Sequence, residues 1–407
     1  MGDRAVAQPD FRILMTCDAA SLRVSAPRIA AAALHPWSGA VARPLGSRVQ
    51  PVHSRAGLVL ALRDPSGRIG LGEASPLPGM SPDTLADCAQ VLKDVPALLG
   101  HAAQDDAGWP ILPSLRALPA ARFAFETAFA DLWAQTQRDE LGSSLTLAQI
   151  LGGLANPAPI ELNALVASIG EAQAAVQAGF RTLKWKIGGP DFTADRALLQ
   201  TLRASLPTDV ALRVDANGAY CVTAANEYLA ALADLRLEYV EQPVAAGAWD
   251  TQALQSAGVP LAADESLLLP NERARLWATK QAVVWVIKPA LHGLRGARDL
   301  ALQAQAQGID VVITHLFDGP VALAAARELA HSLQSPPRAC GLAGHAALAA
   351  WPALPADAVA PPVPRAFADG PEIRAGSTRL HSHGGVGLGR VDRQAFLAAL
   401  TAGDRAP

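Results

Sequence analysis

The feature that most constrains the fold is a repeat of short apolar segments that begins near Ile160. The segments expected to be strands end near Ala167, Lys186, Asp215, Glu241, Asp264, Lys288 and His315, and a weaker one covers 339–342. They recur about every 25 residues, which is the spacing of a strand followed by a crossover helix. Eight such units predict an α/β fold, a modified TIM or (β/α) barrel with its active site at the carboxyl ends of the strands. An open doubly wound sheet is the competing fold, but it would place a Gly-rich turn after its first strand, and residues 167–171 form no such turn.

The chain before this repeat mixes strands and helices, and we expect it to form an α+β capping domain. The expected strands cover 23–33, 57–63 and 69–73, and the expected helices cover 82–99, with Ser81 as N-cap, and 119–136. A chain of 407 residues has room for two domains. The predicted division is a capping domain over 1–125, a barrel over 126–350, and a tail over 351–407 that returns to the capping domain.

Two irregular segments of the capping part are expected to act as lids. Residues 35–55 are rich in Gly, Pro and Arg and look too irregular for a regular element, and residues 76–81 read Pro-Leu-Pro-Gly-Met-Ser. Long loops inside compact domains are often binding loops that close over a site. Arg43, Arg48 and Arg55 are therefore candidates for contacting the carboxylates of a substrate.

Composition disfavours several classes of protein. The net charge of −3 is spread without a long run of one sign, so neither nucleic acid nor a membrane is expected as a partner. The chain shows no apolar run near the roughly 20 residues that span a bilayer, and its first residues lack a signal-peptide core. Four cysteines that lie far apart are typical of reduced thiols in a cytoplasmic protein. The glycine run at 383–389 lacks the Lys-Ser/Thr of a phosphate loop, so a nucleotide site is not expected. The sequence does not indicate an oligomeric state.

Two lysines in the second strand of the repeat are candidate catalytic residues. Lys184 and Lys186 flank Trp185. Because alternate residues of a strand point to the same face, both lysines emerge side by side and Trp185 points the opposite way. Two nearby ammonium groups disfavour each other's charged form, which lowers the pKa of at least one lysine towards the range of a general base.

Carboxylates end the next three strands, and a third lysine ends the strand after them. Asp215, Glu241 and Asp264 occupy these positions, followed by Lys288. Neighbouring strands lie about 4.8 Å apart, so the three acids can converge on one point. Three carboxylates without His or Cys suit Mg²⁺ before Ca²⁺ or Mn²⁺. Glu265 is a rival to Asp264, although strand alternation should send one of the two away from the metal.

The position of these groups predicts the chemistry of the site. Lys184 and Lys186 lie across the barrel from Lys288, with the metal between them, and the expected partner is a small-molecule carboxylate substrate. The α-proton of a carboxylate held by the metal is acidified because the cation stabilises the enediolate, and a lysine on either face can add or remove a proton. Arg213 shares the inward face of the third strand and is expected to hold an anionic group or to pair with a ligand. Asn217, just beyond that strand, is a second candidate for substrate binding.

This K-x-K, Asp, Glu, Asp, Lys series resembles the muconate-lactonizing branch of the enolase superfamily. The phrase from Gly70 to Ser81 resembles a capping-domain loop of the o-succinylbenzoate synthases of that branch, and the phrases 287–290 and 341–343 also resemble that group. The resemblance extends from about residue 23 to residue 388. It implies a barrel covered by a capping domain whose loops lie over the barrel mouth.

The resemblance also implies a reaction. The activity would be that of an Mg²⁺-dependent hydro-lyase of menaquinone biosynthesis, which converts 2-succinyl-6-hydroxy-2,4-cyclohexadiene-1-carboxylate to o-succinylbenzoate through an enediolate. Lys186 would remove the α-proton and return it to the departing hydroxide, and Lys288 would stay charged beside the ring and the enediolate. Lys184 would hold the carboxylate and tune Lys186. The implied Mg²⁺ ligands are Asp215, Glu241 and Asp264.

Other activities use similar sites. N-succinylamino acid racemases share the site of the synthases and stay open as an alternative. Dipeptide epimerases of this superfamily carry Asp-x-Asp on the last strand to hold a substrate ammonium, and residues 338–342 contain no acid. A His315–Asp318 base of the mandelate racemase kind fits poorly with Lys288 on the opposite face, so His315 is expected to be structural or part of a loop. A non-catalytic ligand-binding barrel is disfavoured by the full set of three acids and three lysines.

Overall fold

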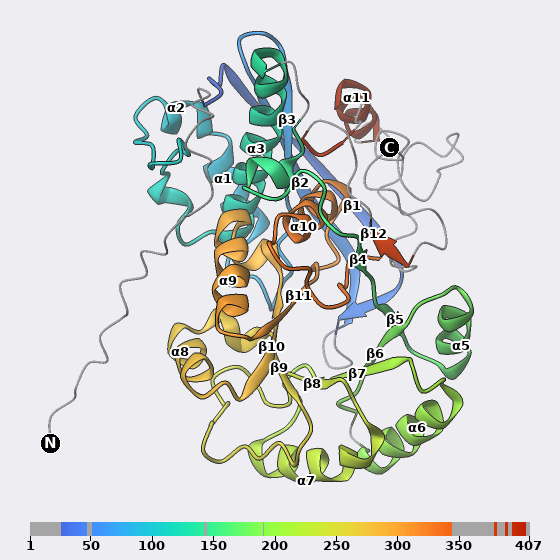
Figure 1. Ribbon diagram of the computed structural model, residues 1–407. Helices are drawn as coiled ribbons and strands as arrows, with labels where there is room; N and C mark the ends of the chain where they lie inside the picture. The colour runs from blue at the N-terminus through green and yellow to red at the C-terminus, as the bar shows by residue number, and fades with distance from the viewer. Residues whose placement is uncertain are drawn as a thin grey trace, which may run out of the picture.

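The structure is a computed structural model that describes residues 26–46, 51–141, 145–189, 191–343, 378–380, 387–389 and 393–403. The described chain forms a curved parallel sheet surrounded by helices and, beside it, an antiparallel sheet that carries a long helix (Figure 1). The first is the predicted barrel, and the second is the predicted α+β capping part.

The barrel sheet has seven strands whose spatial order, β11-β10-β9-β8-β7-β6-β5, follows the order of the chain. The strands are β5 (Ala164–Val166), β6 (Thr182–Lys186), β7 (Ala211–Asp215), β8 (Tyr239–Glu241), β9 (Leu261–Ala263), β10 (Ala282–Ile287) and β11 (Asp310–Ile313). The segment at 340–341 closes the barrel, because Cys340 forms a parallel bridge with Leu162 and Gly341 forms one with Thr314. A doubly wound sheet would reverse its strand order at a switch point, and this sheet does not, so the barrel prediction is confirmed.

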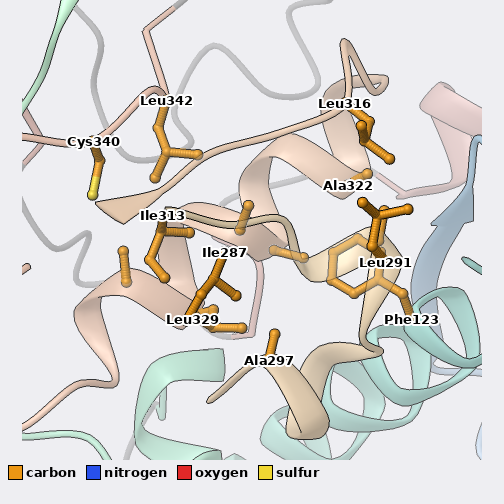
Figure 2. Packing of buried hydrophobic residues seen from close by; sticks show 14 of the residues in the cluster. Phe123, Ile287, Leu291, Ala297, Ile313, Leu316, Ala322, Leu329, Cys340 and Leu342 are labelled. Carbon is orange, nitrogen blue, oxygen red and sulfur yellow. The ribbon is translucent and has the colours of Figure 1, made fainter. Parts of the chain in front are cut away.

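Helices cover the outer face of the barrel (Figure 1). They are α5 (Ile169–Gln177), α6 (Phe192–Ser205), α7 (Val222–Leu232), α8 (Pro270–Thr279), α9 (Leu294–Ala306) and α10 (Pro320–His331), and the short α4 (Leu147–Ile150) precedes them. Figure 2 shows part of the core, in which Ile287 and Ile313 of the sheet lie among residues of α9 and α10. A separate small cluster fills the barrel interior and consists of Tyr239, Ala262, Val284, Val286 and Val312.

The capping sheet is a meander of three antiparallel strands, and the long helix α3 packs directly on it. The elements are β1 (Ala31–Gly46), β2 (Pro51–Arg63), β3 (Ile69–Ala74), α1 (Leu85–Leu92), α2 (Val95–Leu99) and α3 (Pro119–Leu141). Two glycines of β3 allow the close approach of α3, because a Cβ at Gly70 would lie 2.1 Å from Ala128 O and one at Gly72 would lie 1.8 Å from Ala124 O. The Gly-x-Gly at 70–72 is therefore required for α3 to pack this closely on β3.

Several predictions for the capping part are wrong in detail. Residues 35–55 do not form an irregular loop: β1 and β2 extend through most of this segment as a hairpin, with an irregularity in register between Ala40 and Leu45. Cross-strand pairing outweighs the Gly and Pro content here. The single helix expected over 82–99 is two, α1 and α2, and the N-cap of α1 is Thr84, not Ser81. Thr84 and Asp87 form a capping box.

The described parts of the tail return to both bodies. β12 (Arg379–Leu380) pairs antiparallel with β4 (Ile160–Glu161), and α11 (Arg393–Gly403) contacts β1. The glycine run at 383–389 lies mostly outside the described residues. The expected domain boundary after residue 125 falls inside α3, and the division into three ranges stays a prediction.

Two further findings concern membrane crossing and the cysteines. The described helices include none with the length and apolar character to cross a membrane. Three of the four cysteines lie in the described residues, where Cys88 and Cys340 are buried free thiols and Cys221 is an exposed one.

Candidate active site

A cavity of about 950 Å³ opens at the carboxyl ends of the barrel strands. Seven of the eight predicted site residues line it: Lys184, Lys186, Asp215, Asn217, Glu241, Asp264 and Lys288. The capping part also contributes, through Val52 of β2 and the loop residues 77–80. The structure thus brings together, in one pocket, groups that are spread over more than 100 residues of sequence.

Lys184 bridges two of the predicted metal ligands. The parallel register places Asp215 directly beside Glu241 on the neighbouring strand. Lys184 Nζ lies 2.8 Å from Asp215 Oδ2 and 2.7 Å from Glu241 Oε1. Burial disfavours the charged lysine, but the two carboxylates outweigh burial and hold the pKa of Lys184 well above its ordinary value. Lys184 is therefore a fixed positive charge and is unsuited to act as a base.

The two carboxylates respond differently to this lysine. Burial raises the pKa of Asp215, but the ammonium groups of Lys184 and Lys186 outweigh burial, and its pKa falls to about 2. Burial and the negative charge of Asp215 raise the pKa of Glu241 to about 7. Glu241 Oε2 is buried and has no hydrogen-bond partner in the structure. One carboxylate oxygen at the centre of the site is therefore available to a ligand.

Lys186 has surroundings unlike those of Lys184, although both point into the barrel and Trp185 points outwards as predicted. Lys186 Nζ donates a hydrogen bond of 2.9 Å to the amide oxygen of Asn217. Burial lowers the pKa of Lys186, and the nearby charges of Lys184 and Lys288 lower it further, against the opposing effect of Asp215. A lysine with a lowered pKa holds a neutral amine more readily and can act as a general base.

Lys288 approaches from the opposite side of the pocket and pairs with Asp264. Its Nζ donates to Asp264 Oδ2. Burial opposes the charge of Lys288, but Asp264 and Glu265 outweigh it, so its pKa is raised. Burial and Glu265 raise the pKa of Asp264 to about 6 despite the lysine. Lys186 and Lys288 thus face one pocket with opposite tendencies, one towards the neutral amine and one towards the ammonium.

The predicted metal ligands fit a divalent cation by chemistry and by location. As the side chains stand, no group of three or more His, Cys, Asp or Glu residues in the described ranges is arranged to hold a metal ion. Instead, the ammonium of Lys184 bridges Asp215 and Glu241, and that of Lys288 pairs with Asp264. The donor set consists of carboxylate oxygens that face a common pocket, one of them without a partner, which is the set that Mg²⁺ prefers.

The expectation that strand alternation separates Asp264 from Glu265 is wrong. β9 ends at Ala263, and a short 3-10 helix covers Glu265–Leu268, so the alternation of a strand no longer applies. Both acids line the pocket. Glu265 accepts a 3.5 Å hydrogen bond from the amide nitrogen of Asn217, and its Oε2 is buried without a hydrogen-bond partner in the part of the chain that the structure describes.

Sequence reasoning missed Gln242, which holds the chain that carries Asp264. Its amide oxygen accepts the backbone N–H groups of Asp264, at 3.0 Å, and Ser266, at 3.2 Å. Its amide nitrogen donates to Val244 O and to Ser266 Oγ. Gln242 is fully buried and adopts a positive φ of 41°. Its place next to Glu241 in the Glu-Gln-Pro phrase is the signal that could have indicated this role.

Arg213 does not reach the pocket, in contrast to the prediction that it binds substrate. Its side chain has no exposed surface. The guanidinium donates to Glu238 at 2.7 Å, to Asn163 at 3.2 Å and to the carbonyl of Ala339 at 2.5 Å, and it lies over the ring of Tyr239. Arg213 points inwards as expected, but its Nε, Nη1 and Nη2 all donate to protein groups, one of which is the carbonyl of Ala339 on the segment that closes the barrel.

The lid residues divide into three groups. The 76–81 loop contributes pocket residues, as expected of a lid. Arg55 is buried and donates to main-chain carbonyls, so the structure contradicts its direct contact with a substrate carboxylate. The side chain of Arg43 and the whole of Arg48 lie outside the described residues.

His315 lines the pocket, whereas the carboxylate of Asp318 accepts the N–H of Leu316.

Comparisons with known proteins place this site in a family. Residues 168–389 match the family described as "Enolase C-terminal domain-like". The chain is 31% identical over 296 residues to the o-succinylbenzoate synthase of Thermosynechococcus vestitus. The aligned region covers 69% of this chain and 82% of that protein. It is 28% identical over 306 residues to the L-Ala-D/L-Glu epimerase of Bacillus subtilis, and the aligned region covers 71% of this chain and 81% of that protein. The solved dipeptide epimerase of Methylococcus capsulatus, complexed with Mg and L-Arg-D-Lys, matches with a TM-score of 0.64 and 28% identity over 78% of this chain and 91% of that one.

These relatives include both a synthase and epimerases at similar identity, so similarity alone does not decide between the two reactions. The family match extends over more than half of the chain and includes every lysine and carboxylate of the pocket. Together with the barrel and its capping domain, this match shows that the chain belongs to the enolase superfamily.

Proposed function

We propose that the protein is an Mg²⁺-dependent o-succinylbenzoate synthase, which dehydrates 2-succinyl-6-hydroxy-2,4-cyclohexadiene-1-carboxylate. The observation that carries the proposal is the difference between the two lysines that face the pocket. The surroundings of Lys186 lower its pKa, whereas Asp264 and Glu265 help to raise the pKa of Lys288. A dehydration that uses one base needs this asymmetry, because a single lysine carries out both proton transfers and the other supplies positive charge.

The residues of this chain account for each proton. Neutral Lys186 takes the proton from the carbon next to the substrate carboxylate, and the C–H electrons are delocalised into the enediolate. The C–O bond of the ring hydroxyl then breaks, and the Lys186 ammonium returns its proton to the departing hydroxide, which leaves as water. The products are water and an aromatic carboxylate. Lys288 stays charged throughout and stabilises the developing negative charge.

The metal would be held by Asp215, Glu241 and Asp264, with Glu265 as a further carboxylate at the same end of the pocket. A bound Mg²⁺ would supply a positive charge that stabilises the substrate carboxylate as its α-proton is lost. Relatives solved as complexes with Mg support this choice of metal.

The residues of the pocket wall also favour the proposal that the substrate has no ammonium group. The segment that closes the barrel contributes Gly341 and Ala343 to the lining. Arg338, on the same segment, pairs with Glu238 and Asp310. Residues 338–342 contain no acid that could hold an amino group. A dipeptide substrate would therefore lack the partner that such a group needs at this strand.

The second candidate is racemisation of an N-succinylamino acid. It is favoured by the presence of a lysine on each side of the pocket, which suits proton transfer on both faces of a planar intermediate. The same pocket could carry out both reactions, and the relatives named above include epimerases.

The test is a side-by-side assay of the purified protein with Mg²⁺. Its three substrates are the cyclohexadiene carboxylate, an N-succinyl-L-amino acid and L-Ala-L-Glu. We expect dehydration with a kcat in the usual range of about 1–10³ s⁻¹, measured as the loss of the absorbance of the substrate diene. For the other two substrates, NMR measures the exchange of the α-proton in D₂O. Fast exchange of the N-succinyl substrate without any dehydration would overturn the proposal in favour of the racemase.

A further inference from the structure

Arg55 of β2 connects two loops that belong to different parts of the molecule. Its side chain is only 3% exposed. Nη2 donates to Ser75 O at 2.6 Å and Nη1 donates to Pro76 O at 3.1 Å, on the capping side. Nε donates to Phe317 O at 3.0 Å, on the loop between β11 and α10 of the barrel. One planar guanidinium therefore fixes the distance between a capping loop and a barrel loop.

Both loops form walls of the active-site pocket. The capping loop contributes residues 77–80, directly after the two carbonyls that Arg55 binds. The barrel loop contributes residues 314–317, including Phe317 itself. Arg55 is absent from the lining, although it contacts the chain on both of these sides.

The barrel loop adopts a conformation that needs external support. Phe317 has a φ of 55°, in the left-handed region that bulky side chains rarely adopt. Such a conformation persists when the surrounding structure holds it in place. Besides the bond from Arg55, Leu316 N donates to Asp318 Oδ2 at 2.9 Å and Gly319 N donates to Glu73 Oε1 at 2.8 Å. Residues of β2 and β3 thus hold the strained loop from the capping side.

We propose that Arg55 is a positioning residue, which holds Phe317 and the 77–80 loop in the arrangement that encloses the substrate between these two walls of the pocket. The inference deepens the proposed function, and its kinetic test rests on that function. Arg55 acts through two loops and does not touch the reacting atoms. Its loss should therefore weaken substrate binding more than it slows the proton transfers at Lys186.

A purely electrostatic role makes a different prediction. Arg55 Nη2 lies 3.8 Å from Asp318 Oδ1, and Glu73 is a second buried acid nearby. If neutralising these acids were its role, a lysine at position 55 would replace it. A lysine has one nitrogen on a flexible stem, and it cannot reproduce the planar fork that reaches three carbonyls of two loops. Arg55→Lys and Arg55→Met together separate the two roles.

The first measurement is limited proteolysis with chymotrypsin and does not depend on the reaction. The loops contain suitable sites at Met80 and Phe317, and exposed Leu154 serves as a reference site elsewhere in the barrel. We expect both Arg55 variants to be cleaved about tenfold faster at Met80 and Phe317, with cleavage at Leu154 unchanged, because only the two loops open more often. The matched control is Arg68→Met, which removes an arginine that pairs with Asp64 at the far end of β2. It should leave all three rates unchanged.

The second measurement is steady-state kinetics of the same variants. We expect KM to rise about tenfold in Arg55→Lys and Arg55→Met while kcat falls less than about threefold. Equal acceleration of cleavage at all three sites, or wild-type behaviour of Arg55→Lys, would overturn the positioning role. Should the wild-type protein fail to dehydrate the cyclohexadiene carboxylate, the proposed function fails, and the proteolysis still decides the role of Arg55.

Discussion

At the scale of single residues, the pKa values of the three lysines of the pocket shift in different directions because their surroundings differ. Lys184 lies between two carboxylates, Lys288 is paired with Asp264, and Lys186 donates to the amide of Asn217. Burial lowers the pKa of Lys186, and the charges of Lys184 and Lys288 lower it further, whereas carboxylates outweigh burial at the other two lysines. The same residue type can therefore serve as a fixed charge at two positions and as a base at the third.

This difference predicts a pH dependence of turnover. Only the neutral amine of Lys186 can accept a proton, so kcat/KM should rise with pH to a plateau. Because burial lowers the pKa of Lys186, the midpoint of this rise should lie below the ordinary lysine value of 10.5. Lys186→Ala should reduce kcat by at least about 10²–10⁴-fold. Lys93→Ala, which removes an exposed lysine of the capping part, is the control and should keep the wild-type profile.

Lys288 provides the residue-scale test that separates the two candidate reactions. Arginine keeps the positive charge but cannot act as a base at neutral pH. Lys288→Arg should therefore retain part of the dehydration activity and abolish any racemisation, as measured by product formation and by D₂O exchange. Complete loss of dehydration in Lys288→Arg, with activity remaining in Lys186→Ala, would reverse the assigned roles.

At the scale of elements, the contact between β3 and α3 fixes the strand that leads into the pocket loop at 77–80. Gly70 and Gly72 let the backbone of α3 lie against the strand. The residues that follow β3 directly are Ser75 and Pro76, whose carbonyls bind Arg55. The close contact between backbones thus fixes β3 against α3 and sets where the loop at 75–80 begins, and Arg55 then holds that loop.

A methyl group added at this contact should lower the free energy of unfolding. In Gly72→Ala the new Cβ would lie 1.8 Å from Ala124 O, a backbone atom that cannot move independently of the helix. We expect a loss of about 2–3 kcal/mol in the free energy of unfolding, measured by denaturant titration. Gly170→Ala is the matched control, because its Cβ would meet Ser168 Oγ at 4.0 Å in the exposed first turn of α5. A helical alanine there should be neutral or slightly stabilising.

At the scale of the whole molecule, the strand ends bring four acids to one end of the barrel. Burial and the charge of Asp215 raise the pKa of Glu241 to about 7, which is an energetic cost in the absence of a cation. A divalent cation that binds the folded state should offset this cost and stabilise the protein as a whole.

Mg²⁺ should therefore raise the free energy of unfolding, by about 2.7 kcal/mol at a concentration of 100 times its dissociation constant. Protons compete with the metal for Glu241, so the increment should shrink as the pH falls below about 7. Glu241→Gln should abolish the increment without unfolding the barrel, and Glu227→Gln, at an exposed position of α7, should preserve it. The measurement is denaturant unfolding with Mg²⁺ and with EDTA. A stability that is the same under both conditions would contradict the metal assignment.

The sequence by itself determined the features that depend on local periodicity. A strand has a period of two residues, so the pattern of β6 predicted that Lys184 and Lys186 face the barrel and Trp185 faces outwards. The spacing of the apolar segments predicted the crossover units, and parallel strands bring their carboxyl ends to one side of the sheet. For these reasons Asp215, Glu241 and Lys288 could be assigned to one pocket before any tertiary contact was known.

Tertiary structure decided what depends on partners far apart in the chain. Arg55 looked like a candidate for substrate binding, but it donates to Phe317 O, 262 residues away, and no local pattern encodes such a contact. Arg213 points inwards as its strand position predicts, yet it donates to Glu238, to Asn163 and to the carbonyl of Ala339 on the closing segment of the barrel. Glu265 enters the pocket because β9 ends one residue before Asp264. Periodicity determines the face on which a side chain lies, whereas packing between distant segments determines which group it meets there.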